Sequence, residues 1–421
     1  MSDSVEKADQ HIRSAYIWNT LGSMLNAFQS VIILMVLTRV CDIVTAGIFT
    51  LAYANANLFI HMGSFGMRPF QASDVEPKYG FRAYGRARII TCTAMVLCSW
   101  AWLAFSAVAN AYPWDKTMAV ALMTLMKGVD SVEDVFDGSF QQSGRLDISG
   151  KQMTFRVATT IVVFCGTIIL SRSLIVATIC GFVWTVSFLV GNLLLVRKKY
   201  DLPEIHPTAR SQSPIQLLRE CLPLFLASFL LYYVGNAPKY AIDSVMDDTM
   251  QAIYGFIAMP VFIVGLLAQF VYMPMVQPVS AMLNDRDFKG FTHAFVRQVG
   301  VIVGITLVCI TGAALVGPPV LGWLYHTDLS PWRLELCLLV LGGGFLAMAQ
   351  LFTMGITIMR RQRLLTPVYF VIALVALLVS GPLVQSMGIR GASFCYIACM
   401  AFLAVWFCLL FSWCLRRARS S

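Results

Sequence analysis

The sequence predicts an all-α integral membrane protein in which twelve transmembrane helices form two six-helix lobes related by a pseudo-two-fold axis. Three observations predict this class: the composition, the spacing of the apolar runs and the distribution of Lys and Arg. Hydrophobic residues make up 58% of the 421 residues and charged residues 13%, against about 45 to 50% and about 25% in ordinary soluble proteins. Twelve spans of about 20 residues would use more than half of the chain and leave no folded domain outside the bilayer.

The apolar runs, bounded by charges, Pro and Gly, give the individual spans. They lie at 15–38, 44–66, 87–110, 115–136, 154–171, 174–196, 215–237, 249–272, 293–316, 331–358, 365–385 and 390–414. The segment before the first run, 1–13, is polar and charged, and the run itself exceeds 20 residues. This pattern predicts an uncleaved first helix and not a signal peptide.

The basic residues set the predicted topology. With the N-terminus inside, 24 of the 31 Lys and Arg fall on the cytoplasmic side of these spans. The positive-inside rule then predicts that both termini are cytoplasmic. The net charge of +9 therefore reflects topology, and no nucleic-acid partner is expected.

The twelve cysteines lie mostly inside apolar runs, with no C-x-x-C pair and no Cys/His spacing typical of metal ligands. We interpret them as small core residues and predict no metal and no cofactor. The chain also lacks G-x-S-x-G, H-E-x-x-H and P-loop motifs, so we do not expect an enzyme.

A polar, basic link at 197–214 follows the sixth span and divides the chain into an N-terminal lobe, 1–200, and a C-terminal lobe, 201–421. A shift of 205 residues places 47–49 on 252–254, a weak echo between the halves. Because each half has an even number of spans, we expect a parallel repeat about an axis normal to the membrane. Repeats with a site at their interface are typical of transporters.

Polar residues recur on one face of the spans at 15–38, 44–66 and 215–237, at helical spacings of three and four. Such stripes are the pattern expected of a water-filled vestibule, and interhelical hydrogen bonding is the alternative explanation. A histidine in mid-span could relay protons or could be hydrogen-bonded within the bundle. The candidate substrate-binding residues are Asn26, Asn57, His61, Arg68, Gln71, Tyr232, Asn236 and Lys239.

The span at 115–136 runs into an unusually acidic stretch. Lys127 can neutralise Asp130 three residues later. Either the carboxylates are a solvated helix end, or they form a gate that pairs with basic residues of the other half in one state. The candidate gating residues are Lys127, Asp130, Glu133, Asp134 and Asp137.

Two further sites are candidate bending points. Pro260 interrupts the span at 249–272, and Gly342, Gly343 and Gly344 lie in the span at 331–358. The glycines equally permit close packing of helices.

Five stretches, 37–39, 46–49, 65–75, 132–138 and 141–147, give the chain a family resemblance. The stretches 65–75 and 132–138 read FGMRPFQASDV and VEDVFDG. Over its whole length the chain resembles the polysaccharide transporter and O-antigen flippase branch of the multidrug/oligosaccharidyl-lipid/polysaccharide (MOP) exporter superfamily, so a MATE-like fold is implied. The residues carried over by these stretches are Arg68, Gln71, Asp74, Glu133, Asp134, Asp137 and Gln141.

The resemblance implies a flippase of the bacterial inner membrane that acts without a cofactor. Its cargo would be an undecaprenyl-pyrophosphate-linked oligosaccharide, moved from the inner to the outer leaflet by alternating access for cell-surface polysaccharide such as lipopolysaccharide or capsule. The partners would be this lipid-linked oligosaccharide, the bilayer and other polysaccharide-assembly membrane proteins, with the chain acting as a monomer.

Two alternatives remain open. A cation-coupled multidrug exporter of the same fold is expected to carry an acidic residue deep in an apolar lobe, and the first span has none. A membrane glycan polymerase or ligase is expected to have a larger outer loop than the short links seen here.

Overall fold

The computed structural model describes residues 2–73, 78–199 and 212–420, and within these ranges it contains helices and no strand. Contacts divide the chain into two compact units, unit 1 (Met1–Phe229) and unit 2 (Leu230–Ser421). Most of the predicted link between the lobes, 200–211, lies outside the described residues. Helix α8 (Pro214–Val245) begins in unit 1 and ends in unit 2.

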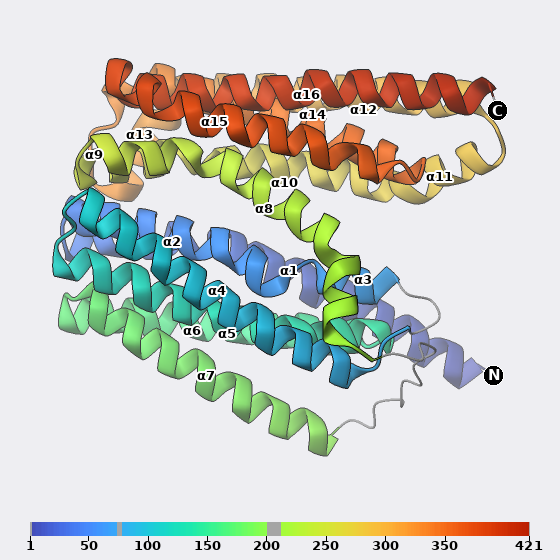
Figure 1. Cartoon of the computed structure of the whole chain (residues 1–421), viewed down its shortest axis with the longest axis horizontal. Coiled ribbons are helices and arrows are strands. Elements are labelled where there is room, and N and C mark those ends of the chain that lie inside the picture. Colours follow the sequence, from blue (N-terminus) through green and yellow to red (C-terminus); the bar gives the residue numbers. More distant parts are fainter. Residues whose placement is uncertain (1, 74–77, 200–211, 421) are drawn as a thin grey trace. The chain divides into compact units, whose positions relative to one another are not determined.

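Unit 1 is a bundle organised around a central helix, α5. Its helices before α8 are α1 (Ser2–Val40), α2 (Ile43–Ser64), α3 (Met67–Ser73), α4 (Phe81–Ala109), α5 (Trp114–Gln142), α6 (Leu146–Ser171) and α7 (Leu174–Lys199). Helix α5 packs against α2, α3, α4, α6 and α7, while α1 packs mainly against α6 (Figure 1). Side chains of α5 can therefore meet those of several neighbouring helices.

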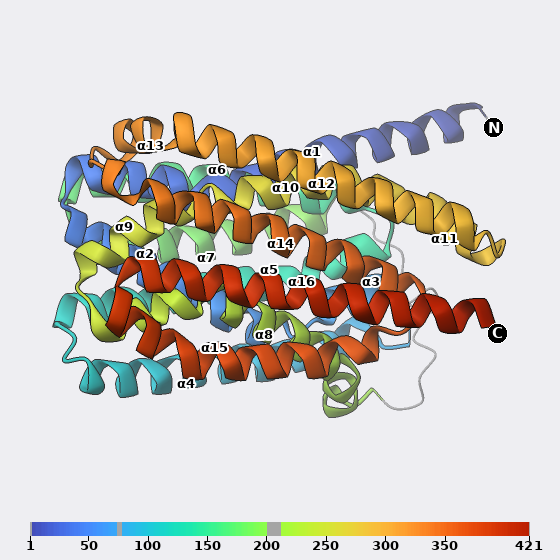
Figure 2. The ribbon, with the colours of Figure 1, turned by 90° about the horizontal axis from the view of Figure 1, so that it is seen from above.

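Unit 2 is organised around α14. After α8 its helices are α9 (Asp248–Ala258), α10 (Val261–Tyr272), η1 (Met273–Met275), α11 (Val276–Asn284), α12 (Phe288–Leu315), α13 (Gly317–Tyr325), η2 (Ser330–Trp332), α14 (Arg333–Ile358), η3 (Gln362–Leu364), α15 (Leu365–Met387) and α16 (Ile389–Ser420). Helix α14 lies along α16 and also packs against α10 and α12 (Figure 2).

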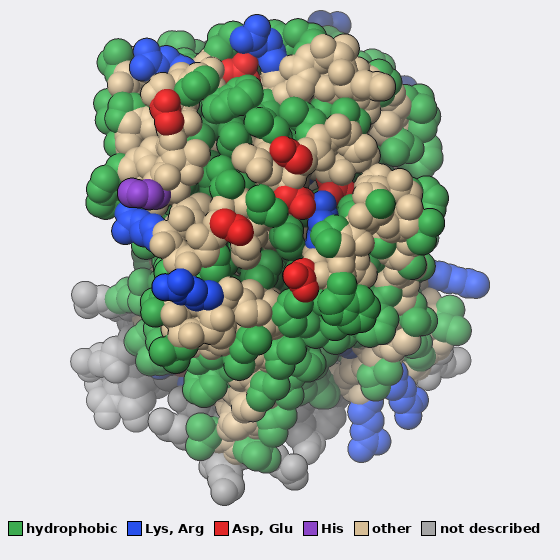
Figure 3. Space-filling view, turned by 90° about the vertical axis from the view of Figure 1, so that its left-hand side faces the viewer, with side chains coloured by type: hydrophobic (Ala, Val, Ile, Leu, Met, Phe, Trp, Pro, Cys, Tyr) green, Lys and Arg blue, Asp and Glu red, His purple; other side chains and the backbone are tan. Residues whose placement is uncertain are grey.

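Eleven of the twelve predicted spans are helical segments that are long and apolar enough to cross a membrane, counted over the described residues. Their outward side chains include many exposed large hydrophobic residues. Figure 3 looks onto one end of the helices, where hydrophobic side chains lie among scattered acidic and basic ones. The remaining predicted span is α5, which is 29 residues long but carries the acidic stretch. The chain is a multi-pass membrane protein.

Pro260 breaks a span, as the sequence predicted. Helix α9 ends at Ala258 and α10 begins at Val261, with Pro260 in the turn between them. A proline lacks the N–H that would continue the helical ladder, and its ring crowds the preceding turn. The span predicted at 249–272 is therefore two shorter helices.

The glycine triplet on α14 does not break its helix, which is continuous from Arg333 to Ile358. Instead, each glycine allows a different helix to approach. A β-carbon added at Gly342 would lie 2.6 Å from Tyr396 of α16, one at Gly343 would lie 3.1 Å from Val261 of α10, and one at Gly344 would collide with Thr306 of α12. The triplet thus permits close packing, which is one of the two roles expected from the sequence.

The first half of α8 is packed into unit 1. The Phe225 ring stacks on Phe65, with ring centroids 4.4 Å apart. Nearby, the Lys78 amine pairs with Glu220 at 2.6 Å, and the Tyr79 hydroxyl donates to the same carboxylate at 3.0 Å. Unit 2 begins partway along the helix.

Candidate functional site

Buried charges gather along α5 in unit 1 and form two chains of alternating sign. The first, which we call the Lys127 chain, contains Lys127, Asp130, Arg156 and Glu133. The predicted pair is present, since the Lys127 amine lies 2.8 Å from Asp130 Oδ2. Arg156 of α6 pairs with Asp130 Oδ1 at 2.5 Å and also with Glu133.

The second chain, the Arg68 chain, contains Arg88, Asp134, Arg68 and Asp137. Arg88 of α4 pairs with Asp134 Oδ2 at 2.7 Å and donates to the Gly63 carbonyl of α2 at 2.5 Å. Arg68 of α3 lies 3.8 Å from Asp134 Oδ1 and 3.2 Å from Asp137 Oδ2. Together, the two chains bring α2, α3, α4 and α6 to the acidic end of α5.

Each chain contains two cations and two anions, so each is formally neutral. An isolated charge in a low-dielectric interior is costly, and a paired charge that is also hydrogen-bonded is tolerated. Lys127 has a further neighbour, because its amine lies 5.2 Å from the centre of the Tyr53 ring, within reach of a cation–π contact. The pairing explains how α5 can lie inside the bundle.

Arg68 is held more loosely than the other three cations. Its side chain is 27% exposed, whereas those of Arg88, Lys127 and Arg156 are 9% exposed or less. Its other hydrogen bonds are long, at 3.2 Å to Gln141 Oε1 and 3.3 Å to the Ser149 hydroxyl. Arg68 is therefore the cation of this network that a ligand could reach with the least rearrangement.

Gln71 fixes α3 against α5. Its side chain is buried, its amide donates to Gln142 Oε1 at 3.2 Å, and its carbonyl oxygen occupies the space where Gly138 lacks a β-carbon. Gln71 and Arg68 thus both contact α5, and their role in substrate binding stays a prediction.

The candidate substrate-binding residues on α1 and α2 are Asn26, Asn57 and His61. Asn57 is half-buried, and its amide donates to the Tyr53 carbonyl of its own helix at 2.8 Å. His61 is half-buried on the same helix, and Asn26 is exposed on α1. Asn19, from the same predicted stripe as Asn26, donates across to the Leu146 carbonyl of α6 at 3.0 Å. Part of this stripe thus joins helices, as the alternative interpretation expected.

The candidates on α8, Tyr232, Asn236 and Lys239, belong to unit 2. The Asn236 amide donates to the Tyr232 carbonyl at 3.0 Å, within the helix. Lys239 is half-buried, and over the described ranges no carboxylate pairs with its amine. Lys239 therefore differs from the cations of the α5 network, each of which has a carboxylate partner.

Sequence reasoning missed Arg88 and Arg156 as members of the network, because it counted both only as cytoplasmic topology signals. Their positions inside helices, seven residues after the start of α4 at Phe81 and ten after the start of α6 at Leu146, were a usable signal. The gate interpretation expected partners from the other half of the chain. In this structure the partners come from unit 1 itself, and pairing with the other half in a second state stays a prediction.

The part of the chain that the structure describes contains no group of three or more His, Cys, Asp or Glu side chains placed to hold a metal ion. The charged cluster of α5 is a set of ion pairs.

Comparison with known proteins identifies the fold. No protein-family model and no curated protein matches the chain. Among solved structures, an inward-facing multidrug-resistance MATE transporter of the MOP superfamily is similar, with a TM-score of 0.69 and 12% identity over 97% of this chain and 99% of that chain. The chain has the MATE fold.

Two other solved structures are also similar to the chain. A eukaryotic MATE transporter has a TM-score of 0.62 and 13% identity over 97% of this chain and 99% of that one. A MOP superfamily transporter from Pyrococcus furiosus has a TM-score of 0.59 and 12% identity over 98% of this chain and 97% of that one, and it is described as having a binding pocket of reversed polarity that suggests a different function.

Proposed function

We propose that the chain is a flippase of the bacterial plasma membrane. It moves an undecaprenyl-pyrophosphate-linked oligosaccharide from the inner to the outer leaflet by alternating access, for cell-surface polysaccharide synthesis. Both termini are cytoplasmic in this proposal, and the chain acts as a monomer without a cofactor. The resemblance of the 65–75 and 132–138 stretches to the O-antigen flippase branch supports it, as does a fold found in transporters.

The observation that carries the proposal is that the charged side chain without a partner of opposite sign is a cation. The four carboxylates of the α5 network are all paired, whereas Lys239 has no carboxylate partner among the described residues. Arg68 is exposed enough to exchange partners. Cations available inside membrane helices favour an anionic cargo, since a phosphate forms charge-assisted hydrogen bonds with Lys and Arg.

The competing function is a cation-coupled multidrug exporter. A cationic drug needs a carboxylate free to pair with it, and the α5 carboxylates already have basic partners. The Pyrococcus furiosus neighbour, with its pocket of reversed polarity, supports the view that proteins of this fold differ in the charge they bind.

The test is transport of a fluorescent pyrophosphate-linked saccharide by the purified chain in liposomes. We expect Lys239→Gln to lower the initial rate at least about tenfold, as for the loss of one charge-assisted contact, and Lys239→Arg to keep most of it. Lys289→Gln, at an exposed lysine of unit 2, is the matched control. An unchanged rate in Lys239→Gln at equal protein level would remove Lys239 from the site.

Deletion of the gene provides the independent test of the cargo. We expect complete, unpolymerised lipid-linked saccharide to accumulate on the inner leaflet. Normal surface glycan together with sensitivity to cationic drugs would instead identify the exporter.

A further inference from the structure

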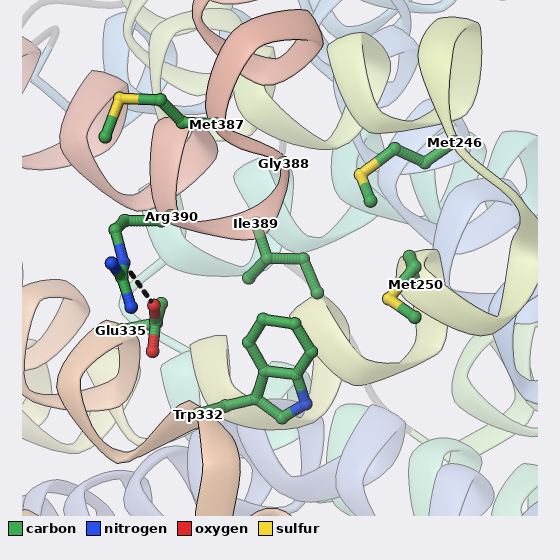
Figure 4. Close-up of a pocket in the computed structure, with 8 residues that line it drawn as sticks. All are labelled: Met246, Met250, Trp332, Glu335, Met387, Gly388, Ile389 and Arg390. Carbon is green, nitrogen blue, oxygen red and sulfur yellow. Dashed lines mark hydrogen bonds and ion pairs between the residues drawn. The ribbon is translucent and has the colours of Figure 1, made fainter.

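A pocket of about 440 Å³ lies in unit 2, where three connections between helices meet. They are the turn from α8 to α9, the η2 turn before α14 and the turn from α15 to α16. The residues that line it are Met246, Met250, Trp332, Glu335, Met387, Gly388, Ile389 and Arg390 (Figure 4). None of these residues belongs to the α5 network or to the polar stripe of α8.

The polar part of the pocket is an arginine that is hydrogen-bonded to a buried carboxylate. Arg390 Nε donates to Glu335 Oε1 at 3.0 Å. The Glu335 side chain is 2% exposed, whereas that of Arg390 is 53% exposed. The two terminal nitrogens of Arg390 form no hydrogen bond with the described residues. The buried carboxylate thus fixes the guanidinium and leaves its two terminal nitrogens available as donors. Their spacing suits two oxygens of a phosphate.

The rest of the lining is apolar. Three methionine side chains, Ile389 and the half-buried indole of Trp332 form this apolar part, with Met246 and Met250 on the side of the pocket away from Arg390. Methionine adapts to irregular apolar ligands, and tryptophan is enriched where a membrane meets water. The pocket also lies at helix ends, and the half-exposed Met387 and Arg390 leave it open.

We propose that this pocket binds a phospholipid of the bilayer. The phosphate accepts hydrogen bonds from the two terminal nitrogens of Arg390, and the glycerol and first acyl carbons lie against the methionines and Trp332. Glu335 balances the charge of Arg390, so the pocket carries no net charge. It therefore recognises the phosphodiester itself and does not distinguish zwitterionic from anionic phospholipids.

The first experiment measures phospholipid retained by the full chain, purified in dodecyl maltoside, by native mass spectrometry with phosphatidylethanolamine. We expect Arg390→Gln to bind the lipid about tenfold more weakly, as for the loss of a charge-assisted pair. Arg333→Gln, at an exposed arginine at the start of α14, should bind like the unchanged chain. Equal retention by Arg390→Gln would overturn the proposal.

A second experiment uses the unchanged chain, so it stands even if a variant fails to fold. A lysophospholipid should displace the bound lipid, whereas a monoacylglycerol of the same chain length, which lacks phosphate, should not. Equal displacement by the monoacylglycerol would overturn phosphate recognition. Equal displacement by inorganic phosphate would identify a free-anion site and overturn the lipid.

Glu335→Gln tests the charge balance. It leaves a net positive pocket, so phosphatidylglycerol should then bind several-fold better than phosphatidylethanolamine, while the unchanged chain binds both alike. The same headgroup ratio in both proteins would contradict the role given to Glu335.

Discussion

Unit 1 and unit 2 fill their interiors with different chemistry. In unit 1, α5 is joined to α3, α4 and α6 by ion pairs. In unit 2, other helices approach α14 closely at its glycines. Nearer the end of α14, the rings of four phenylalanines are in contact: Phe291, Phe295, Phe352 and Phe411. Chains of buried ion pairs therefore lie around the central helix of unit 1, whereas close contacts at glycines and aromatic rings surround the central helix of unit 2.

The difference separates structural charges from those available for ligands. A buried pair is expensive to break, because the remaining partner keeps the cost of desolvation. A half-exposed charge with long contacts contributes little to stability. Substitution of a buried residue with short contacts is therefore expected to damage the fold. Substitution of a half-exposed residue with long contacts is expected to damage function alone.

The largest effect is expected at Arg156, which holds both Asp130 and Glu133. Arg156→Met should lower the free energy of unfolding by about 3 to 5 kcal/mol, because it leaves the buried Glu133 carboxylate unpaired and Asp130 with Lys127 alone. The measurement is thermal unfolding in detergent, with Arg297→Met at an exposed arginine as control. Adding Glu133→Gln should recover part of the loss. A melting temperature unchanged in Arg156→Met would mean that the Lys127 chain does not stabilise unit 1.

An intermediate effect is expected in unit 2. Gly344→Ala places a methyl group against Thr306, and overpacking of this kind costs about 1 to 3 kcal/mol. The same unfolding measurement should show recovery when Thr306→Ala is added. Gly300→Ala is the control, because nothing lies near a β-carbon at that position. Equal stability of the two glycine variants would contradict the packing role of the triplet.

The smallest effect on stability is expected at Arg68. Because its side chain is partly exposed, its contacts are long and glutamine keeps a donor beside the buried Asp137 carboxylate, Arg68→Gln should cost about 1 kcal/mol of unfolding free energy. Transport in the liposome assay should nevertheless fall strongly. A variant that unfolds as readily as Arg156→Met would place Arg68 among the structural charges and remove it from the cargo site.

Much of the architecture could be predicted because the bilayer imposes it. Apolar runs long enough to cross a bilayer can be recognised in the sequence alone. The break at Pro260 follows from the chemistry of a single residue. Even α5 could be placed from its length and its i,i+3 pair of Lys127 and Asp130.

The partners of the α5 carboxylates could not be predicted from the sequence. Arg88 and Arg156 lie on other helices, and their pairing depends on which helix faces meet. The short helices α3 and α13 were also missed, because each is shorter than a span and follows directly from a longer helix. Such contacts are properties of packing, which hydropathy does not report.

The ion pairs of α5 also bear on how the chain enters a membrane during synthesis. A charged residue at the centre of an inserting helix costs about 2.5 to 3.5 kcal/mol, and α5 carries several. Arg68 and Arg88 precede α5 and are already synthesised when it emerges, but Arg156 follows it on α6. Half of the network is therefore incomplete until the ribosome has made the next helix, so stable insertion of α5 is coupled to the arrival of α6.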